Sequence, residues 1–213
     1  MKKNILYLLM PLLFFTAVNA EAQEWCAEGY EDSFSADEIN FYAKILGGAN
    51  FLQNTTTQGN KSTYRTGYII AGSLGYCSCY GLRLEGEYAY RRNALRKIHF
   101  FGDGFSKNGH FQTSSYMANL LWDLPFSLRK GWNIQPFIGF GIGYDFEQMH
   151  SSNSRIVFNQ KWKHFSWQLM GGLAYPIFCN TDITLEYKFH QGGCHFYNHS
   201  LGIGLQYQFV FLR

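Results

Sequence analysis

Long hydrophobic runs are missing from this 213-residue sequence after its first eighteen residues. A helix needs ~20 predominantly apolar residues to cross a bilayer, so this absence excludes transmembrane helices from the rest of the chain. Proline is scarce, with four residues, and the formal net charge is only +3. The low charge leaves no basic footprint for nucleic acid. Few prolines together with many aromatic residues also argue against a disordered chain.

The N-terminus has the features of an export signal. Lys2 and Lys3 precede an apolar run over residues 5–18, and small residues follow at Ala20 and Ala22. This pattern predicts a signal peptide over residues 1–22, cut after one of these two alanines, because the run is too short for a membrane anchor. We expect residues 23–39 to form a periplasmic arm and residues 40–213 to form one domain.

Apolar and polar residues alternate along the rest of the chain. Residues 82–90 place leucine, glycine and tyrosine on one face, while Arg83, Glu85 and Glu87 project from the other. This period of two predicts a β-strand. In a soluble sheet the apolar face would pack inward, whereas in a membrane barrel it would face lipid and the charges would line a lumen.

Eight such strands are predicted, and several have the ~9 to 11 residues that cross a bilayer obliquely. Their ranges are 41–51, 67–77, 82–90, 111–124, 134–147, 165–175, 183–190 and 199–211. The connections after the first, third and fifth strands are long and polar, and those after the second, fourth and sixth are shorter. Aromatic residues also gather near strand ends on the apolar face. These features favour an all-β, eight-stranded antiparallel up-and-down transmembrane barrel over a secreted soluble sandwich.

Three stretches carry a resemblance to a known family, namely residues 41–51, 136–144 and 201–209. The chain resembles the eight-stranded bacterial outer-membrane β-barrel family that includes OmpA-type barrel domains, OmpX-like proteins and surface antigens. The resemblance implies a place in the outer membrane of a Gram-negative type bacterium, surrounded by its lipid. It also implies that the C-terminal strand is read by the outer-membrane assembly machinery.

The predicted inward face collects charges of both signs. They are Lys44, Arg83, Glu85, Glu87, Asp123, Asp145, Glu186 and Lys188. Charges enclosed in a narrow lumen must pair to offset their lost hydration, so we expect a salt-bridge network that plugs the barrel. Glycines on the inner faces of the fifth and eighth strands would leave space for water, and a narrow diffusion channel is the alternative.

The five cysteines lie in an exported chain, where disulfides are permitted. Cys26 is in the predicted arm, Cys79 and Cys179 are in predicted periplasmic turns, and Cys77 points inward beside a turn. These four are candidates for arm-to-turn or intermolecular disulfides, the latter giving a linked oligomer. Cys194 lies apart, and an odd total leaves at least one thiol free or paired with another chain.

Two further groups contain chemically active residue types. His190, Cys194, His195 and His199 are donors suited to zinc or copper, although their spacing matches no zinc signature. The other group is His164 and Ser166, which resemble the His-x-Ser element of outer-membrane lipid A deacylases, with Glu186 as a conceivable third member. We expect no resident metal, because the spacing of the first group is not that of a zinc site. We expect no enzyme, because Ser166 would face the lumen, away from a lipid substrate.

The sequence therefore predicts a structural and surface-interacting outer-membrane protein without a cofactor. Envelope integrity, adhesion or antigenic display would depend on the external loops over residues 54–66, 91–110 and 148–163, which are the predicted contacts for a host or surface partner.

Overall fold

The computed structural model describes residues 39–53, 55–57, 60–78, 81–100, 103–105, 108–124, 134–153, 156–193 and 196–211. The predicted signal peptide and nearly all of the predicted arm fall outside these ranges. Eight long strands are present, and they are β1 (Ile39–Leu52), β4 (Gly67–Cys77), β5 (Leu82–Phe100), β7 (Asn108–Asp123), β8 (Gln135–Asn153), β9 (Ile156–Phe178), β10 (Thr181–Gln191) and β11 (Tyr197–Phe211). Three short ones accompany them, β2 (Thr55–Thr57), β3 (Asn60–Tyr64) and β6 (Asp103–Phe105).

The long strands close into a ring. Each pairs antiparallel with its neighbours along the chain, β5 pairs with β7, and β1 pairs with β11 to complete the circuit. The predicted eight-stranded antiparallel barrel is confirmed. The described residues include no helix long and apolar enough to cross a membrane.

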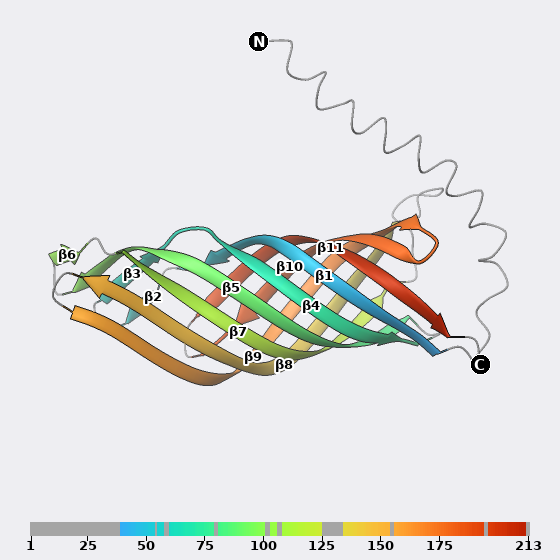
Figure 1. Ribbon diagram of the computed structural model, residues 1–213, viewed down its shortest axis with the longest axis horizontal. Helices are drawn as coiled ribbons and strands as arrows, with labels where there is room; N and C mark the ends of the chain where they lie inside the picture. The colour runs from blue at the N-terminus through green and yellow to red at the C-terminus, as the bar shows by residue number, and fades with distance from the viewer. Residues whose placement is uncertain are drawn as a thin grey trace, which may run out of the picture.

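The strands wind obliquely around the barrel axis (Figure 1). Following paired residues from Lys161 of β9 through β8, β7, β5, β4, β1, β11 and β10 leads back to β9 at Gly171, ten residues further along. A stagger of this size in an eight-stranded ring corresponds to a strand tilt of roughly 40°, with an interior only wide enough for side chains.

The apolar faces of the strands point outward. Leu84, Phe140 and Leu205 are 61%, 48% and 45% exposed, whereas Arg83 and Glu85 are 3% and 1% exposed. A soluble barrel would show the reverse, because its apolar side chains would fill the core. The described residues thus have the inside-out distribution of a barrel surrounded by hydrocarbon.

The two ends of the barrel differ, and we name them the termini end and the hairpin end. The start of β1 and the end of β11 lie together at the termini end, whereas β2, β3 and β6 lie at the hairpin end (Figure 1). Two turns at the termini end are short: residues 78–81 join β4 to β5, and residues 179–180 join β9 to β10. In the first turn Gly81 has a φ of +74°, which favours glycine. The predicted turn over residues 125–133 lies outside the described residues.

The prediction of long irregular loops is wrong, because strands extend into these ranges. β5 continues to Phe100 and β7 begins at Asn108, while β8 continues to Asn153 and β9 begins at Ile156. β3 extends the sheet along β5 beyond the end of β4. The apolar alternation that predicts a strand stops where the chain leaves the membrane, because both faces then meet water, but the backbone hydrogen-bond ladder does not need that alternation.

The inner face is less polar and less open than the sequence predicts. Two apolar clusters lie inside, formed by Leu46, Ile69, Ala71 and Ala89 and by Leu121, Phe137, Met170 and Ala174. The predicted water space beside the inner glycines is also filled. A Cβ added to Gly139 would contact Met170 and Leu121, and one added to Gly204 would contact Thr184. These inner-face glycines make room for neighbouring side chains.

Candidate functional site

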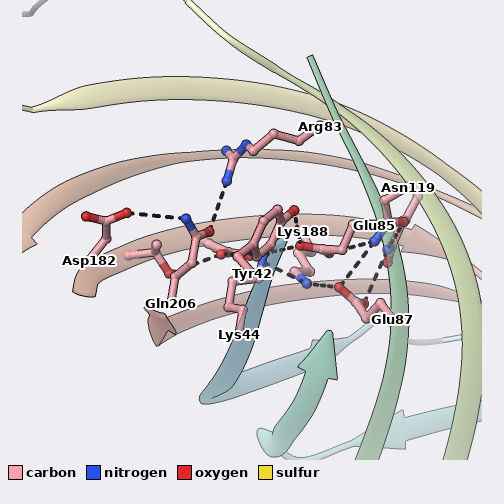
Figure 2. A network of polar contacts seen from close by, with 12 residues as sticks. Tyr42, Lys44, Arg83, Glu85, Glu87, Asn119, Asp182, Lys188 and Gln206 are labelled. Atoms are coloured by element: carbon pink, nitrogen blue, oxygen red, sulfur yellow. Dashed lines mark hydrogen bonds and ion pairs between the residues drawn. The ribbon is translucent and has the colours of Figure 1, made fainter. Parts of the chain in front are cut away.

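A charge network occupies the middle of the lumen (Figure 2). Lys44 of β1 lies with its Nζ 2.8 Å from Glu85 Oε2 and 3.0 Å from Glu186 Oε1. Lys188 of β10 pairs with Glu87 and lies 3.5 Å from Glu186 Oε2. Because β5 and β10 stand on opposite sides of the ring, the pair of Lys188 with Glu87 crosses the full width of the lumen.

Neutral donors complete the coordination of the carboxylates. Asn119 Nδ2 donates to Glu85 Oε1 over 3.0 Å and to Glu87 Oε2 over 3.4 Å. Tyr42 donates its hydroxyl to Glu85 over 3.0 Å, and Gln168 Nε2 donates to Glu87 over 3.3 Å. Three buried carboxylates share two ammonium groups here, so such donors offset part of the cost of burying the additional negative charge.

A second polar layer lies nearer the termini end. Arg83 Nη2 is 2.8 Å from Asp123 Oδ1, and Arg83 Nη1 donates to Gln206 over 3.0 Å. Gln206 in turn donates to Asp182 over 3.3 Å. The guanidinium also lies over the Phe137 ring, with 4.7 Å to the centroid. This stacking covers the one charged side chain of the layer that is almost fully buried.

A third layer lies nearer the hairpin end. His190 Nε2 is 2.7 Å from Asp145 Oδ2, and Ser166 donates to the other oxygen of Asp145 over 3.0 Å. Arg91 donates through Nη1 to Ser115 over 2.7 Å. All these side chains are buried. Asp145 is therefore held by a histidine and a serine, and not by the central network in which the sequence analysis placed it.

The described residues between β10 and β11 lie across the hairpin end of the lumen. Gly192 and Gly193 are buried, and the Gly193 amide donates to Glu147 of β8 over 3.4 Å. Phe196 stacks on Phe111 of β7 with ring centroids 5.1 Å apart. Since β7 and β11 are on opposite sides of the ring, this turn reaches the far wall and covers the layers below it.

Of the eight predicted lumen charges, five meet in the central network: Lys44, Glu85, Glu87, Glu186 and Lys188. Arg83 and Asp123 form a separate pair, and Asp145 lies in the third layer. The uncharged partners and Arg91 were not among the predicted lumen residues. That arginine continues the inward alternation of Arg83, Glu85 and Glu87, so extending the predicted strand by one residue would have found it.

The described members of the predicted metal group do not converge. His190 points into the lumen, whereas His199 is on the outer face, where its Nδ1 is 2.7 Å from the Tyr187 hydroxyl. Cys194 and His195 fall outside the described residues. Within the described ranges, no group of three or more His, Cys, Asp or Glu side chains could hold a metal ion.

The predicted His164, Ser166 and Glu186 group is not arranged for nucleophilic catalysis. The Ser166 hydroxyl donates to Asp145, and its other contact is with the sulfur of Met117 at 3.5 Å. Glu186 pairs in register with Gly172, six residues from Ser166 along β9 and so roughly 20 Å away. A nucleophile needs a base within hydrogen-bond reach.

The cysteines are only partly described. Cys179 is disulfide-bonded, and Cys77 Sγ lies 3.7 Å from the Ser78 carbonyl oxygen. Cys26 and Cys79 fall outside the described residues. The pairing of the four candidate cysteines stays a prediction.

A closed ring of eight antiparallel strands, apolar outside and ionised inside, defines an integral membrane β-barrel. The family model described as outer membrane protein beta-barrel domain matches residues 10–209. The chain belongs to this family and is an outer-membrane protein of the Gram-negative type. A comparison with curated protein sequences gives no match.

Several solved structures have the same fold. Neisserial surface protein A is 15% identical, with a TM-score of 0.56 over 79% of this chain and 97% of that one. The outer membrane protein OprG from Pseudomonas aeruginosa is 12% identical, with a TM-score of 0.55 over 82% and 96%. The attachment invasion locus protein Ail of Yersinia pestis, in complex with the heparin analogue sucrose octasulfate, is 13% identical, with a TM-score of 0.51 over 81% and 99%. At these identities the likeness establishes the fold.

Proposed function

We propose that this protein is a non-conducting outer-membrane barrel that presents extended β-hairpins outside the cell for contact with a surface partner. The hairpin end faces the exterior in this proposal, and the termini end faces the periplasm. Long connections outside and short turns inside are the usual arrangement of bacterial barrels.

The single observation that carries the proposal is the uneven height of the barrel wall. β8 has 19 residues and β9 has 23, far more than the ~10 needed to cross the bilayer. Neighbouring β10 has only 11 residues, and its pairing with β9 ends at Gln191 and Trp167. Residues 156–166 of β9 therefore lie beyond the end of β10.

This part of β9 has an edge available for pairing. It is bonded to β8 on one side, and among the described strands none pairs with it on the other. An exposed strand edge presents N–H and C=O groups that can add an extended segment from another protein. Ail, a barrel of the same fold, is an attachment protein solved with a heparin analogue, which supports a surface role for this architecture.

The lumen supports the non-conducting part of the proposal. Three polar layers and the turn over the hairpin end occupy it, and side chains fill the space beside the inner glycines. The predicted salt-bridge network is thus one of several layers that support a closed lumen. Loss of the central ion pairs alone would leave the other layers in place.

The test shortens the projecting hairpin without touching the barrel. Replacing residues 151–158 by Asn-Gly removes the tip of the β8–β9 hairpin and restores a two-residue turn between the paired residues His150 and Asn159. Bacteria producing the full chain should adhere to an epithelial cell layer more than cells with an empty vector, and the shortened variant should lose most of that gain. A matched replacement of residues 99–104 by Asn-Gly, at the tip of β5 and β6, serves as the control. Equal adhesion by the full chain and the empty vector would refute the surface role.

A further inference from the structure

The outward faces of β5, β7, β8 and β9 change in character toward the hairpin end. Paired residues across these strands form successive rows. One row is apolar and consists of Leu84, Leu120, Phe140 and Leu169. A second row, nearer the hairpin end, is aromatic and consists of Tyr88, Tyr116, Tyr144 and Phe165. Such a change from aliphatic to aromatic side chains is expected where a strand passes from hydrocarbon toward the headgroup region. Because the strands are tilted, each row slants across the barrel and lies nearer the hairpin end on β9 than on β5.

The aromatic rings of this boundary contact one another across the strands. Tyr88 and Tyr116 have centroids 5.1 Å apart, Tyr116 and Phe146 are 5.7 Å apart, and Tyr144 and Phe165 are 6.0 Å apart. These two groups of contacting rings together make an aromatic girdle, which anchors this side of the barrel at the membrane interface.

Cationic side chains follow directly beyond the girdle. Arg92, Lys161 and Lys163 are exposed on the outward face, one or two outward positions past the aromatic row. The Lys163 ammonium lies over the Phe146 ring at 5.1 Å from its centroid, which places the charge at the upper edge of the girdle. Between the cations, Gln112 accepts from the Tyr90 hydroxyl over 3.1 Å and donates to Gln148 over 2.7 Å.

This basic belt covers only one side of the barrel. On β1, β10 and β11, the described outward side chains nearest the hairpin end are neutral aromatics, amides and a histidine: Phe51, Gln53, Phe189, Gln191, Tyr197 and His199. Nor does any described outward residue on the belt side, from the aromatic row upward, carry a carboxylate. The positive charge is thus gathered on one side and is not neutralised locally.

We infer that the basic belt, Arg92, Lys161 and Lys163, binds the phosphate groups of an outer-leaflet lipid. On each strand the cations lie beyond the aromatic rings, on the headgroup side, and they face outward from the barrel beside acyl chains packed on those rings. Phosphate oxygens accept charge-assisted hydrogen bonds from guanidinium and ammonium groups, and the neighbouring glutamine amides supply further polar contacts. A soluble anion would lack the acyl chains that the aromatic row contacts.

The experiment measures lipid binding to the full chain in a neutral detergent by native mass spectrometry. The probe is lipid A bearing both phosphates, and the comparison is the same glycolipid without phosphate. Each cation near a membrane surface is worth ~1 kcal/mol, so the triple variant R92Q/K161Q/K163Q should bind the phosphorylated probe about a hundredfold more weakly. The wild-type preference for the phosphorylated probe should shrink in high salt.

Matched variants separate the belt from the fold and from other anions. K161R/K163R keeps the charges and should retain the affinity, and all variants should migrate as heat-modifiable barrels on gels. Unchanged lipid binding by the triple variant would overturn the inference. So would displacement of the lipid by an equal concentration of inorganic phosphate, or a preference of the belt for a soluble sulfated polysaccharide. None of these outcomes depends on the adhesion assay of the β8–β9 hairpin.

Discussion

Lys188 shows how single residues hold the lumen together. Its side chain is fully buried and contacts two carboxylates that come from opposite walls of the barrel. A buried ion pair adds little net stability compared with apolar residues of the same shape, but removing one partner leaves an uncompensated charge. A substitution that removes only one member of the network should therefore destabilise the barrel more than one that removes both members of a pair.

Replacing this lysine gives the clearest stability prediction. K188M should lower the free energy of unfolding in urea by about 3–5 kcal/mol, because Glu87 and Glu186 keep their charges without a cation between them. The double variant K188M/E87M should recover much of the loss. K161M, at an exposed lysine, should change stability by less than ~0.5 kcal/mol. Equal effects of K188M and K161M would contradict the structure.

Ser166 tests whether a buried serine here does chemistry. Its hydroxyl donates to Asp145, so its proton points at a carboxylate and not at a histidine. We expect lipid A from cells producing the wild type, S166A or the empty vector to have the same acyl chains by mass spectrometry. S200A, which removes another buried lumen hydroxyl, is the matched control. An acyl chain lost only with the wild type and S200A would establish a lipid hydrolase.

At the scale of elements, the alternation of residues predicts which strands exist and which way they face. Both conclusions rest on the apolar outer face, which the membrane imposes on residues such as Leu84 and Leu205. Where β5, β8 and β9 continue past the membrane, nothing imposes that alternation and their ends could not be predicted. The layering of charges also escaped prediction, because it depends on the stagger between strands, which places Asp145 beside His190 and away from Lys44.

Strand β8 also shows a role of glycine that the sequence pattern misread. A Cβ at Gly141 would collide with the Asn119 amide, which donates to Glu85 and Glu87. G141V should displace this amide and lower the free energy of unfolding by about 1–3 kcal/mol, the usual range for overpacking. G47V is the control, since a Cβ there has nothing within 4 Å. If urea unfolding gave equal losses for both variants, the steric account of β8 would fail.

At the scale of the whole molecule, the closed ring performs two separate tasks. Its outer surface fixes the protein in the membrane through the apolar and aromatic rows, and its tall wall over β8 and β9 carries backbone beyond the membrane at the hairpin end. The lumen contributes rigidity, because contacts such as those of Lys44 join walls that are far apart in the ring. A surface partner would thus meet hairpins held on a rigid base.

Planar-bilayer recordings test whether the lumen as a whole is closed to ions. Because layers at three depths and the turn bearing Phe196 each occupy the lumen, the wild type should show no steady current. E85Q and F196A should also stay closed, since each loosens one level and leaves the others. A known porin reconstituted in the same membranes confirms that conduction is detectable. A steady wild-type current that changes its ion selectivity in E85Q would instead establish the narrow diffusion channel, with the charges of the lumen lining its path.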